Sequence, residues 1–284
     1  ENGKKSQVLK IDGKLYYFSA NPMNKYETHE QVRGKLARPK FYISFPDNPE
    51  ENPTYYFDAE TGAAVTNQFV YADGHWYYFG KDGKALLFDQ VINGQHLYFD
   101  ANGRQVKGGF VTNTDGSRSF YHWNTGDKLV STFFATGHDR WYYADDRGNV
   151  VTGAQVINGQ KLFFDTDGKQ VKGAFATNAN GSRSYYHWNT GNKLVSTFFT
   201  SGDNNWYYAD AKGEVVVGEQ TINGQHLYFD QTGKQVKGAT ATNPDGSISY
   251  YDVHTGEKAI NRWVKIPSGQ WVYFNAQGKG YVSN

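Results

Sequence analysis

The chain has 284 residues, a net charge of +1, no cysteine, 32 glycines and 17% aromatic residues. Without cysteine it has neither a disulfide framework nor a thiolate metal site. The near-neutral charge gives no electrostatic reason to expect nucleic acid or an acidic membrane as a partner, and no apolar run approaches the roughly 20 residues of a membrane-spanning helix. Many aromatic residues and glycines are typical of short strands joined by tight turns.

Three segments follow one another along the chain. Residues 1–20 contain IDGKLYYFSA, which matches INGQHLYFDA further on, and are interpreted as a partial first repeat. Residues 21–53 hold five of the seven prolines and show no alternation, so we expect an irregular proline-rich insertion there. From residue 54 to residue 284 one pattern continues, which predicts a single continuous solenoid.

A fixed period governs that third segment. The motif INGQ begins at Ile92, Ile157 and Ile222, so the period is 65 residues. Four tryptophans keep the same spacing; they are Trp76, Trp141, Trp206 and Trp271. A fixed period over most of a chain indicates a repeat architecture.

Each period divides into three similar units, each with an aromatic strand, a turn that ends in glycine and a short second strand. Asn102-Gly103 and Thr125-Gly126 are turn dipeptides of the kind that close hairpins. An isolated hairpin is marginally stable in water, so hairpins in a row must bury their apolar faces on one another. The sequence therefore predicts an all-β solenoid of stacked β-hairpins, with about three hairpins per 65-residue turn and about twelve in total.

Alternation along the strands assigns side chains to an inner or an outer face. The expected inner residues are Leu97, Phe99 and Val106 in the first unit, Phe120, His122 and Leu129 in the second, and Trp141, Tyr143 and Val151 in the third. The same alternation places Tyr121, Trp123 and Tyr142 outside.

Candidate catalytic and metal-binding residues all have a structural interpretation. His122 and its copy His187 lie between aromatic residues on a strand, which favours a partly buried structural histidine over a catalytic base. Asp100 recurs one and two periods later directly before a turn, where aspartate caps its own backbone. The run Asp165-Thr166-Asp167-Gly168 resembles the start of a calcium loop but lacks the later glycine and glutamate, so we interpret it as a turn and expect no metal. No glycine-rich phosphate loop leads into a helix, so we expect no cofactor.

A polar set recurs that core packing does not explain. The segment QVKG, with Gln105 and Lys107, is followed by Thr112 and returns in the next two periods. Glutamine supplies donors and an acceptor, lysine supplies three donors, and a tyrosine ring supplies a flat apolar face. This combination suits a sugar ring, although internal duplication of solvent-facing residues would also produce it.

These motifs resemble the C-terminal glucan-binding repeats of glucansucrases, the dextransucrase-type glucosyltransferases of oral streptococci and related lactic acid bacteria. The resemblance rests on the joint occurrence of INGQ, YFD, QVKG and WYY, covers residues 55–284 well and covers residues 1–20 in part. It implies a β-solenoid that binds α-glucan such as dextran through a stacking tyrosine with glutamine, lysine and threonine partners. The implied site residues are Gln105, Lys107, Thr112, Tyr121, Gln170, Lys172, Thr177, Tyr186, Gln235, Lys237, Thr242 and Tyr251. Tyr98, Phe163 and Tyr228 are alternative stacking rings, and Val253 stands where earlier copies have tryptophan.

The resemblance also leads to expectations about the parent protein, its location and its partners. The catalytic barrel of the family is absent, so we expect a non-catalytic module that is covalently linked to a catalytic domain in a parent protein. We expect a secreted or cell-surface location, a monomer, and neither nucleic acid nor membrane as a partner. Two alternatives stay open at this point: a choline-binding cell-wall module, and a structural spacer without a ligand.

Overall fold

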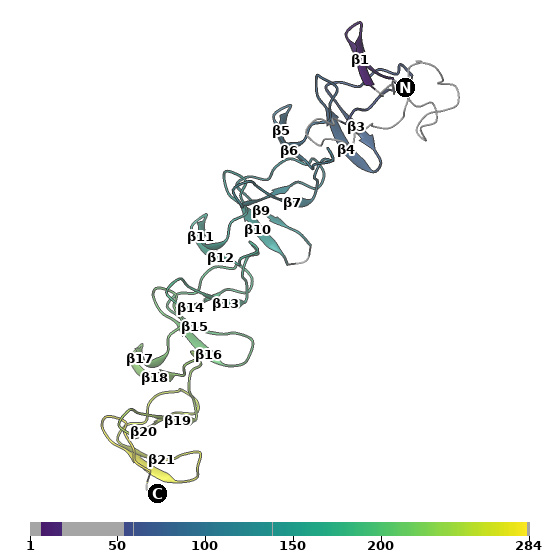
Figure 1. The fold of residues 1–284 in the computed structure, drawn as a ribbon. Coiled ribbons are helices and arrows are strands. Elements are labelled where there is room, and N and C mark those ends of the chain that lie inside the picture. Colours follow the sequence, from purple (N-terminus) through teal and green to yellow (C-terminus); the bar gives the residue numbers. More distant parts are fainter. Residues whose placement is uncertain (1–6, 19–53, 59, 138, 283–284) are drawn as a thin grey trace. The chain divides into compact units, whose positions relative to one another are not determined.

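The computed structural model describes residues 7–18, 54–58, 60–137 and 139–282, which belong to two compact units (Figure 1). The first unit is Glu1–Thr132 with Ala144–Val150, and the second is Phe133–Tyr143 with Val151–Asn284. The insertion predicted at residues 21–53 lies outside the described residues. The continuity of one solenoid over residues 54–284 stays a prediction.

The described residues form an all-β fold built from eleven two-stranded antiparallel sheets. The hairpins up to the boundary between the units are β1 (Gln7–Ile11) with β2 (Lys14–Phe18), β3 (Gln68–Ala72) with β4 (His75–Phe79), β5 (Phe88–Ile92) with β6 (Gln95–Phe99), β7 (Gly109–Thr112) with β8 (Arg118–Tyr121), and β9 (Thr132–Ala135) with β10 (Trp141–Ala144). The hairpins beyond it are β11 (Gly153–Ile157) with β12 (Gln160–Phe164), β13 (Ala174–Thr177) with β14 (Arg183–Tyr186), β15 (Thr197–Thr200) with β16 (Trp206–Ala209), β17 (Gly218–Ile222) with β18 (Gln225–Phe229), β19 (Ala239–Thr242) with β20 (Ile248–Tyr251), and β21 (Arg262–Lys265) with β22 (Trp271–Phe274). Three hairpins fall in each 65-residue period, which confirms the predicted repeat solenoid. The described residues contain no helix long and apolar enough to cross a membrane.

The repeated INGQ motif is the turn that closes a hairpin. Ile92 pairs with Gln95, and the two residues between them, Asn93 and Gly94, have φ angles of 52° and 81°. Positive φ at both central positions defines a type I′ turn, whose twist matches that of the flanking strands and which favours Asn-Gly. The predicted turn at Asn102-Gly103 is confirmed as a turn, but it does not join two full strands. That turn does reverse the chain, but the segment after it forms only an isolated bridge.

The segment after each hairpin ties that hairpin to the one before it. After the turn that begins at Asp100, the amide of Gln105 donates to the carbonyl of Trp76 on β4 at 2.7 Å, and the amide of Val106 donates to the carbonyl of Tyr98 on β6 at 2.8 Å. Equivalent bonds run from Lys128 to His96 and from Val150 to Arg118 in the first unit, and from Gln170 to Trp141, Lys193 to Lys161, Val215 to Arg183, Gln235 to Trp206 and Lys258 to His226 in the second. Within each unit these bonds hold successive hairpins together as a stack.

The core confirms part of the predicted face assignment. Leu97, Phe99 and Phe120 are buried as expected. Tyr121 was predicted outside but is fully buried, because β8 is covered on both faces: Phe120 packs on Phe110 and the Tyr121 ring packs on Tyr98. Alternation cannot separate two faces that are both covered.

In the third unit of the period the prediction is wrong for Trp141 and Tyr142, whereas Tyr143 and Val151 pack on the core as expected. Trp141 was expected inside but 39% of it is exposed, whereas Tyr142 was expected outside and is buried. The run WYY has aromatic residues at successive positions, so both faces of β10 are apolar in sequence. The small Ala144, which is fully buried, marks the inner face that it shares with Tyr142.

Burial changes the acidity of the core tyrosines. Desolvation raises the pKa of Tyr251 above its ordinary value of 10.0, and the neighbouring Glu219 carboxylate raises the pKa further. Desolvation also raises the pKa of Tyr186, and desolvation together with the hydrogen bond to Asp89 raises that of Tyr121. These hydroxyls therefore keep their protons at pH values where exposed tyrosines lose them.

We expect Phe164→Ala to lower the free energy of unfolding by about 3–5 kcal/mol, because it leaves a cavity in a packed core. Phe164 is fully buried and clusters with Ile157 and Leu162. Urea unfolding of the whole chain measures the change. Trp188→Ala, at a side chain that is 71% exposed, is the matched control and should cost less than about 1 kcal/mol. Equal losses in the two variants would contradict the proposed core.

Stability should fall as the pH rises above about 10. In that range the unfolded state releases tyrosine protons that the folded state retains, so the unfolded state binds fewer protons and the free energy of unfolding decreases with pH. Tyr251→Phe removes one of these protons and should make the decrease less steep, whereas the two proteins should show parallel curves between pH 7 and 9. Urea titrations at a series of pH values test this, and identical slopes above pH 10 would refute it.

Candidate binding site

The glutamine and lysine of the first QVKG segment bridge two neighbouring hairpins. The backbone bond from Gln105 to Trp76 sets their position, and Lys107 Nζ then lies 5.4 Å from the centroid of the Trp76 ring. Lys107 Nζ donates to the carbonyl of Asn124 at 3.0 Å, and Gln105 Nε2 donates to the carbonyl of Thr125 at 3.2 Å. The pair thus joins the tryptophan of one hairpin to the turn that follows β8.

The same arrangement occurs in the next two periods, which lie in the second unit. Lys172 Nζ is 5.4 Å from the Trp141 ring centroid, and Lys237 Nζ is 5.7 Å from that of Trp206. The amides of the two glutamines, Gln170 and Gln235, each donate to a turn carbonyl at 3.4 Å. The three copies therefore share one geometry, in which lysine covers a tryptophan face.

A glycine in the turn makes room for the glutamine. Gly191 has a φ of 70°, and a Cβ atom there would lie 2.3 Å from Gln170 Nε2. Gln170 is consequently buried against the turn, although the sequence pattern predicted an outward side chain. Its main contribution is to hold the turn that presents Trp188 and Asn189.

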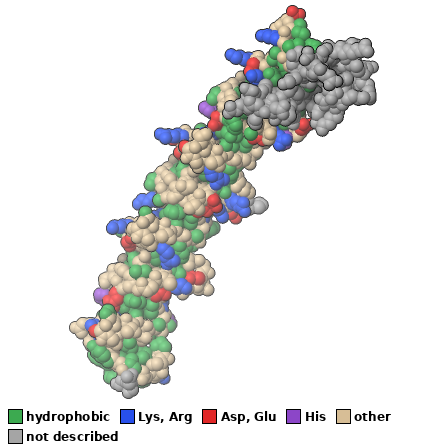
Figure 2. Space-filling view, viewed as in Figure 1, with side chains coloured by type: hydrophobic (Ala, Val, Ile, Leu, Met, Phe, Trp, Pro, Cys, Tyr) green, Lys and Arg blue, Asp and Glu red, His purple; other side chains and the backbone are tan. Residues whose placement is uncertain are grey.

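In the second unit this arrangement forms a cleft of about 750 Å³. The lining residues are Asp139, Trp141, Asp165, Lys169, Gln170, Val171, Lys172, Ala174, Trp188 and Asn189. Trp141 and Trp188 are both exposed, and carboxylate, amide and ammonium groups lie beside them. In the space-filling view, hydrophobic side chains reach the surface next to lysine and arginine side chains (Figure 2). The cleft therefore combines flat apolar surfaces with hydrogen-bonding groups of both kinds.

The predicted stacking tyrosines are not part of this surface. Tyr121, Tyr186 and Tyr251 are buried, and the hydroxyl of Tyr121 donates to Asp89 Oδ1 at 2.9 Å. Their rings pack on the alternative rings that the resemblance offered, with centroid distances of 5.8 Å to Tyr98, 5.7 Å to Phe163 and 5.5 Å to Tyr228. A ring without exposed faces cannot stack on a ligand, so the assignment of the three buried tyrosines as stacking platforms was wrong. Tyr98, Phe163 and Tyr228 are half-buried.

The predicted threonines lie away from the cleft. Thr112, Thr177 and Thr242 are exposed, but Thr177 is not among the residues that line the cleft. Ala174, which does line it, is three residues away at the opposite end of β13, and a strand advances roughly 3.3 Å per residue. Thr177 instead pairs in register with Arg183 near the hairpin turn.

The exposed aromatic side chains at the cleft are tryptophans, whereas the sequence analysis expected tyrosines there. Trp123 was predicted outside and is exposed, as is its copy Trp188. Trp141 was assigned to the core on strand alternation alone. Its regular spacing with Trp76 and Trp206, directly before a pair of aromatic residues, was the signal that could have identified an exposed series.

The histidines and aspartates have the structural roles that the sequence predicted. His122 is half-buried, and its Nδ1 accepts from the amides of Asn124 and Thr125 at 3.3 Å. Asp252 replaces histidine in the third period and accepts the equivalent amides. Asp165 Oδ1 accepts from the amides of Asp167 and Lys169, which confirms a turn in place of a calcium loop. No group of three metal-ligating side chains occurs within the described ranges.

The sequence matches two families of repeats. It matches the family described as Choline-binding repeat at residues 90–133, 151–198 and 216–263, and the family described as Putative cell wall binding repeat at residues 67–85, 196–215 and 261–279. These segments fall in both structural units and include the QVKG and WYY motifs.

Solved structures with a similar fold include choline binding protein F from Streptococcus pneumoniae, with a TM-score of 0.57 and 18% identity over 99% of this chain and 100% of that one. CbpJ from Streptococcus pneumoniae has a TM-score of 0.57 and 17% identity over 97% of this chain and 100% of that one. At such identities the similarity establishes the fold alone.

Curated relatives have much higher identity. Glucosyltransferase-S of Streptococcus mutans is 40% identical over 224 residues, which are 78% of this chain and 15% of the relative. Glucosyltransferase-I of the same species is 42% identical over 258 residues, 90% of this chain and 16% of the relative. The chain thus spans only a small part of these relatives' length. The chain therefore contains repeats that match the choline-binding and cell-wall-binding families, and it is homologous to part of streptococcal glucosyltransferases.

Proposed function

We propose that this chain is a non-catalytic carbohydrate-binding module for α-glucan of the dextran type. The observation that carries the proposal is the cleft in which Trp141 and Trp188 stand beside Lys172, in an arrangement that recurs along the chain. An indole face suits the apolar face of a glucose ring, and ammonium, amide and carboxylate groups suit its hydroxyls. The relatives' names, which are those of glucosyltransferases, support a glucan as the ligand.

The binding surface is repeated but not uniform. The first period has Trp76 with Trp123, and the second has Trp141 with Trp188. The third has Trp206 but carries Val253 in place of the second tryptophan. We therefore expect the first two clefts to bind glucan more tightly than the third. Linked weak sites suit a polymer of identical units, because each bound site raises the effective concentration of the next.

The biological setting follows from the relatives. In a parent protein the module would be covalently linked to a glucosyltransferase catalytic domain and would hold product polymer close to it, or hold the protein on polymer at the cell surface. A secreted or cell-surface location and a monomeric state belong to the same proposal. Glucosyltransferase relatives and repeats described as cell-wall-binding support it.

Choline is the second candidate ligand, since one matched family is described as a choline-binding repeat and exposed indole faces attract quaternary ammonium ions. The lysines argue against it. Each of Lys107, Lys172 and Lys237 places an ammonium group over the tryptophan of its own cleft, at 5.4 to 5.7 Å from the ring centroid. A bound cation would compete for that face and would meet a like charge. A spacer without a ligand is the third interpretation and predicts no binding to either compound.

Replacing single residues tests the clefts. Trp188→Ala should raise the apparent dissociation constant for dextran roughly tenfold, because one linked site is lost. Val253→Trp should lower it, because it restores the missing indole in a turn that already accommodates tryptophan in two copies. Affinity electrophoresis in gels with graded dextran measures both.

Val156→Trp is the control for this pair of variants, since Val156 is exposed but does not line the cleft. It should leave migration in dextran unchanged. A parallel gel with immobilised choline decides between the ligands: retardation there, with free migration in dextran, would replace the glucan proposal with the choline one. Free migration in both gels would leave the spacer interpretation.

The repeated sites also predict a dependence on ligand length. Isomaltose should bind weakly, and dextran should bind more tightly by a factor of ~10² or more, because one polymer chain spans several sites. Isothermal titration with isomaltose and with dextrans of increasing length measures this. Equal affinities per molecule for isomaltose and long dextran would contradict a multivalent surface.

A further inference from the structure

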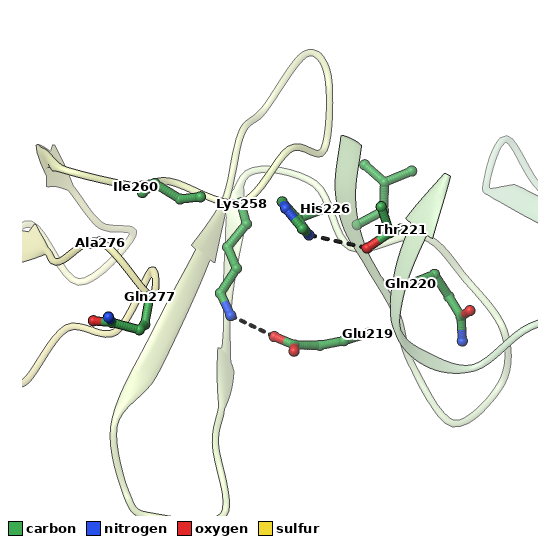
Figure 3. A pocket seen from close by; sticks show the side chains of 9 residues that line it. Glu219, Gln220, Thr221, His226, Lys258, Ile260, Ala276 and Gln277 are labelled. Carbon is green, nitrogen blue, oxygen red and sulfur yellow. Dashed lines mark hydrogen bonds and ion pairs between the residues drawn. The ribbon is translucent and has the colours of Figure 1, made fainter. Parts of the chain in front are cut away.

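A second cavity lies in the third period and is separate from the tryptophan clefts (Figure 3). It has a volume of about 410 Å³ within the second unit. The lining residues are Glu219, Gln220, Thr221, His226, Leu227, Lys258, Ile260, Ala276 and Gln277. They come from β17 and β18, from the segment after β20 and from the turn after β22. None of these nine residues is tryptophan, tyrosine or phenylalanine, so the cavity lacks the electron-rich rings that bind a quaternary ammonium ion.

A fixed carboxylate stands at the edge of this cavity. Lys258 Nζ donates to Glu219 Oε1 at 2.6 Å, and the hydroxyl of Tyr251 donates to the same oxygen at 3.1 Å. The Lys258 side chain is only 12% exposed, whereas that of Glu219 is 56% exposed. The protein thus holds one carboxylate oxygen and leaves the other, Oε2, as an acceptor on the accessible side.

Other lining groups add donors and acceptors around the same space. His226 Nδ1 and Thr221 Oγ1 lie 3.2 Å apart (Figure 3). The amide of Gln220 points away from Glu219 and donates to the carbonyl of Val217 at 2.8 Å, and the amide of Gln277 also points away from the Glu219–Lys258 pair (Figure 3). Ile260, which is partly exposed, provides an apolar surface. An oriented carboxylate beside a hydroxyl and an imidazole suits a ligand with several hydroxyls.

Internal duplication accounts for only part of this composition. One and two periods earlier, the position of Glu219 is occupied by Ala154 and Asp89, and that of Gln277 by Lys212 and Arg147. The QVKG residues, by contrast, are the same in all three periods. Lys258 and Gln220 recur in all three periods, as Lys193 and Lys128 and as Gln155 and Gln90. The combination of Glu219 with Gln277 occurs in the third period alone, which is also the period that carries Val253.

We propose that this cavity is a second kind of saccharide site, in which Glu219 accepts hydrogen bonds from adjacent hydroxyls of a glucosyl residue. Thr221 and His226 bond further hydroxyls, and Ile260 contacts the apolar face of the ring. The inference rests on the proposed glucan-binding function and gives the third period a site of its own. Lys258 acts as a positioning residue, because its hydrogen bond fixes the carboxylate.

The test follows two kinds of reporter in one isotope-labelled protein, the whole chain, during titration with isomaltotriose. The imidazole signals of His226 report this cavity, and the indole signal of Trp188 reports the cleft of the second period. Glu219→Ala should raise the dissociation constant measured at His226 at least tenfold and leave the value measured at Trp188 unchanged. Because Ala154 occupies the same position in the second period, the hairpin tolerates this substitution.

Glu257→Ala is the matched control, since Glu257 is exposed on a turn of the same period and does not line the cavity. It removes the same charge and should leave both dissociation constants unchanged. Movement of the Trp188 signal with no response at His226 would overturn the cavity proposal alone. An unchanged His226 dissociation constant in Glu219→Ala would do the same. If neither reporter responded, the glucan-binding function itself would be refuted.

Discussion

One backbone hydrogen bond recurs along the chain, and the rest of each unit depends on it. The amide that follows a hairpin and its turn donates to a carbonyl on the preceding hairpin, as from Gln105 to Trp76 at 2.7 Å. A two-stranded hairpin alone is only marginally stable, because it has no second layer on which to bury its aromatic face. By joining consecutive hairpins at a fixed register, this bond lets each supply that layer for the next.

The same bond determines the geometry of the binding surface. Once the amide of Gln105 is attached to Trp76, the lysine two residues later lies over the indole ring, and the glutamine side chain reaches the next turn. The backbone hydrogen bond from Gln105 to Trp76 therefore both joins two hairpins and positions the side chains of the proposed binding surface. The backbone bond recurs from hairpin to hairpin, but lysine covers a tryptophan only where the donor segment is QVKG and the acceptor carbonyl belongs to a tryptophan, which happens once in each period.

The sequence predicted the period, the three hairpins in it and the partnership of Gln105 with Lys107, because each leaves a pattern that recurs at fixed spacing. It did not predict that Tyr121 would be buried and Trp141 exposed. Aromatic residues occupy successive positions in these strands, so alternation in hydrophobicity cannot show which face is covered. It also gave no sign of the cavity at Glu219, whose lining is assembled from segments as distant as Thr221 and Gln277.

The lysines also bear on how one fold serves different ligands. Exposed tryptophans on stacked hairpins provide flat, electron-rich surfaces that attract either a cation or the apolar face of a sugar. When a lysine ammonium group of the protein lies over the ring, it makes the cation–π contact itself and repels a second cation. It also offers donors that a neutral polyol can use and a cation cannot. We infer that a lysine at this position disfavours quaternary ammonium on such a surface and favours a neutral polyol.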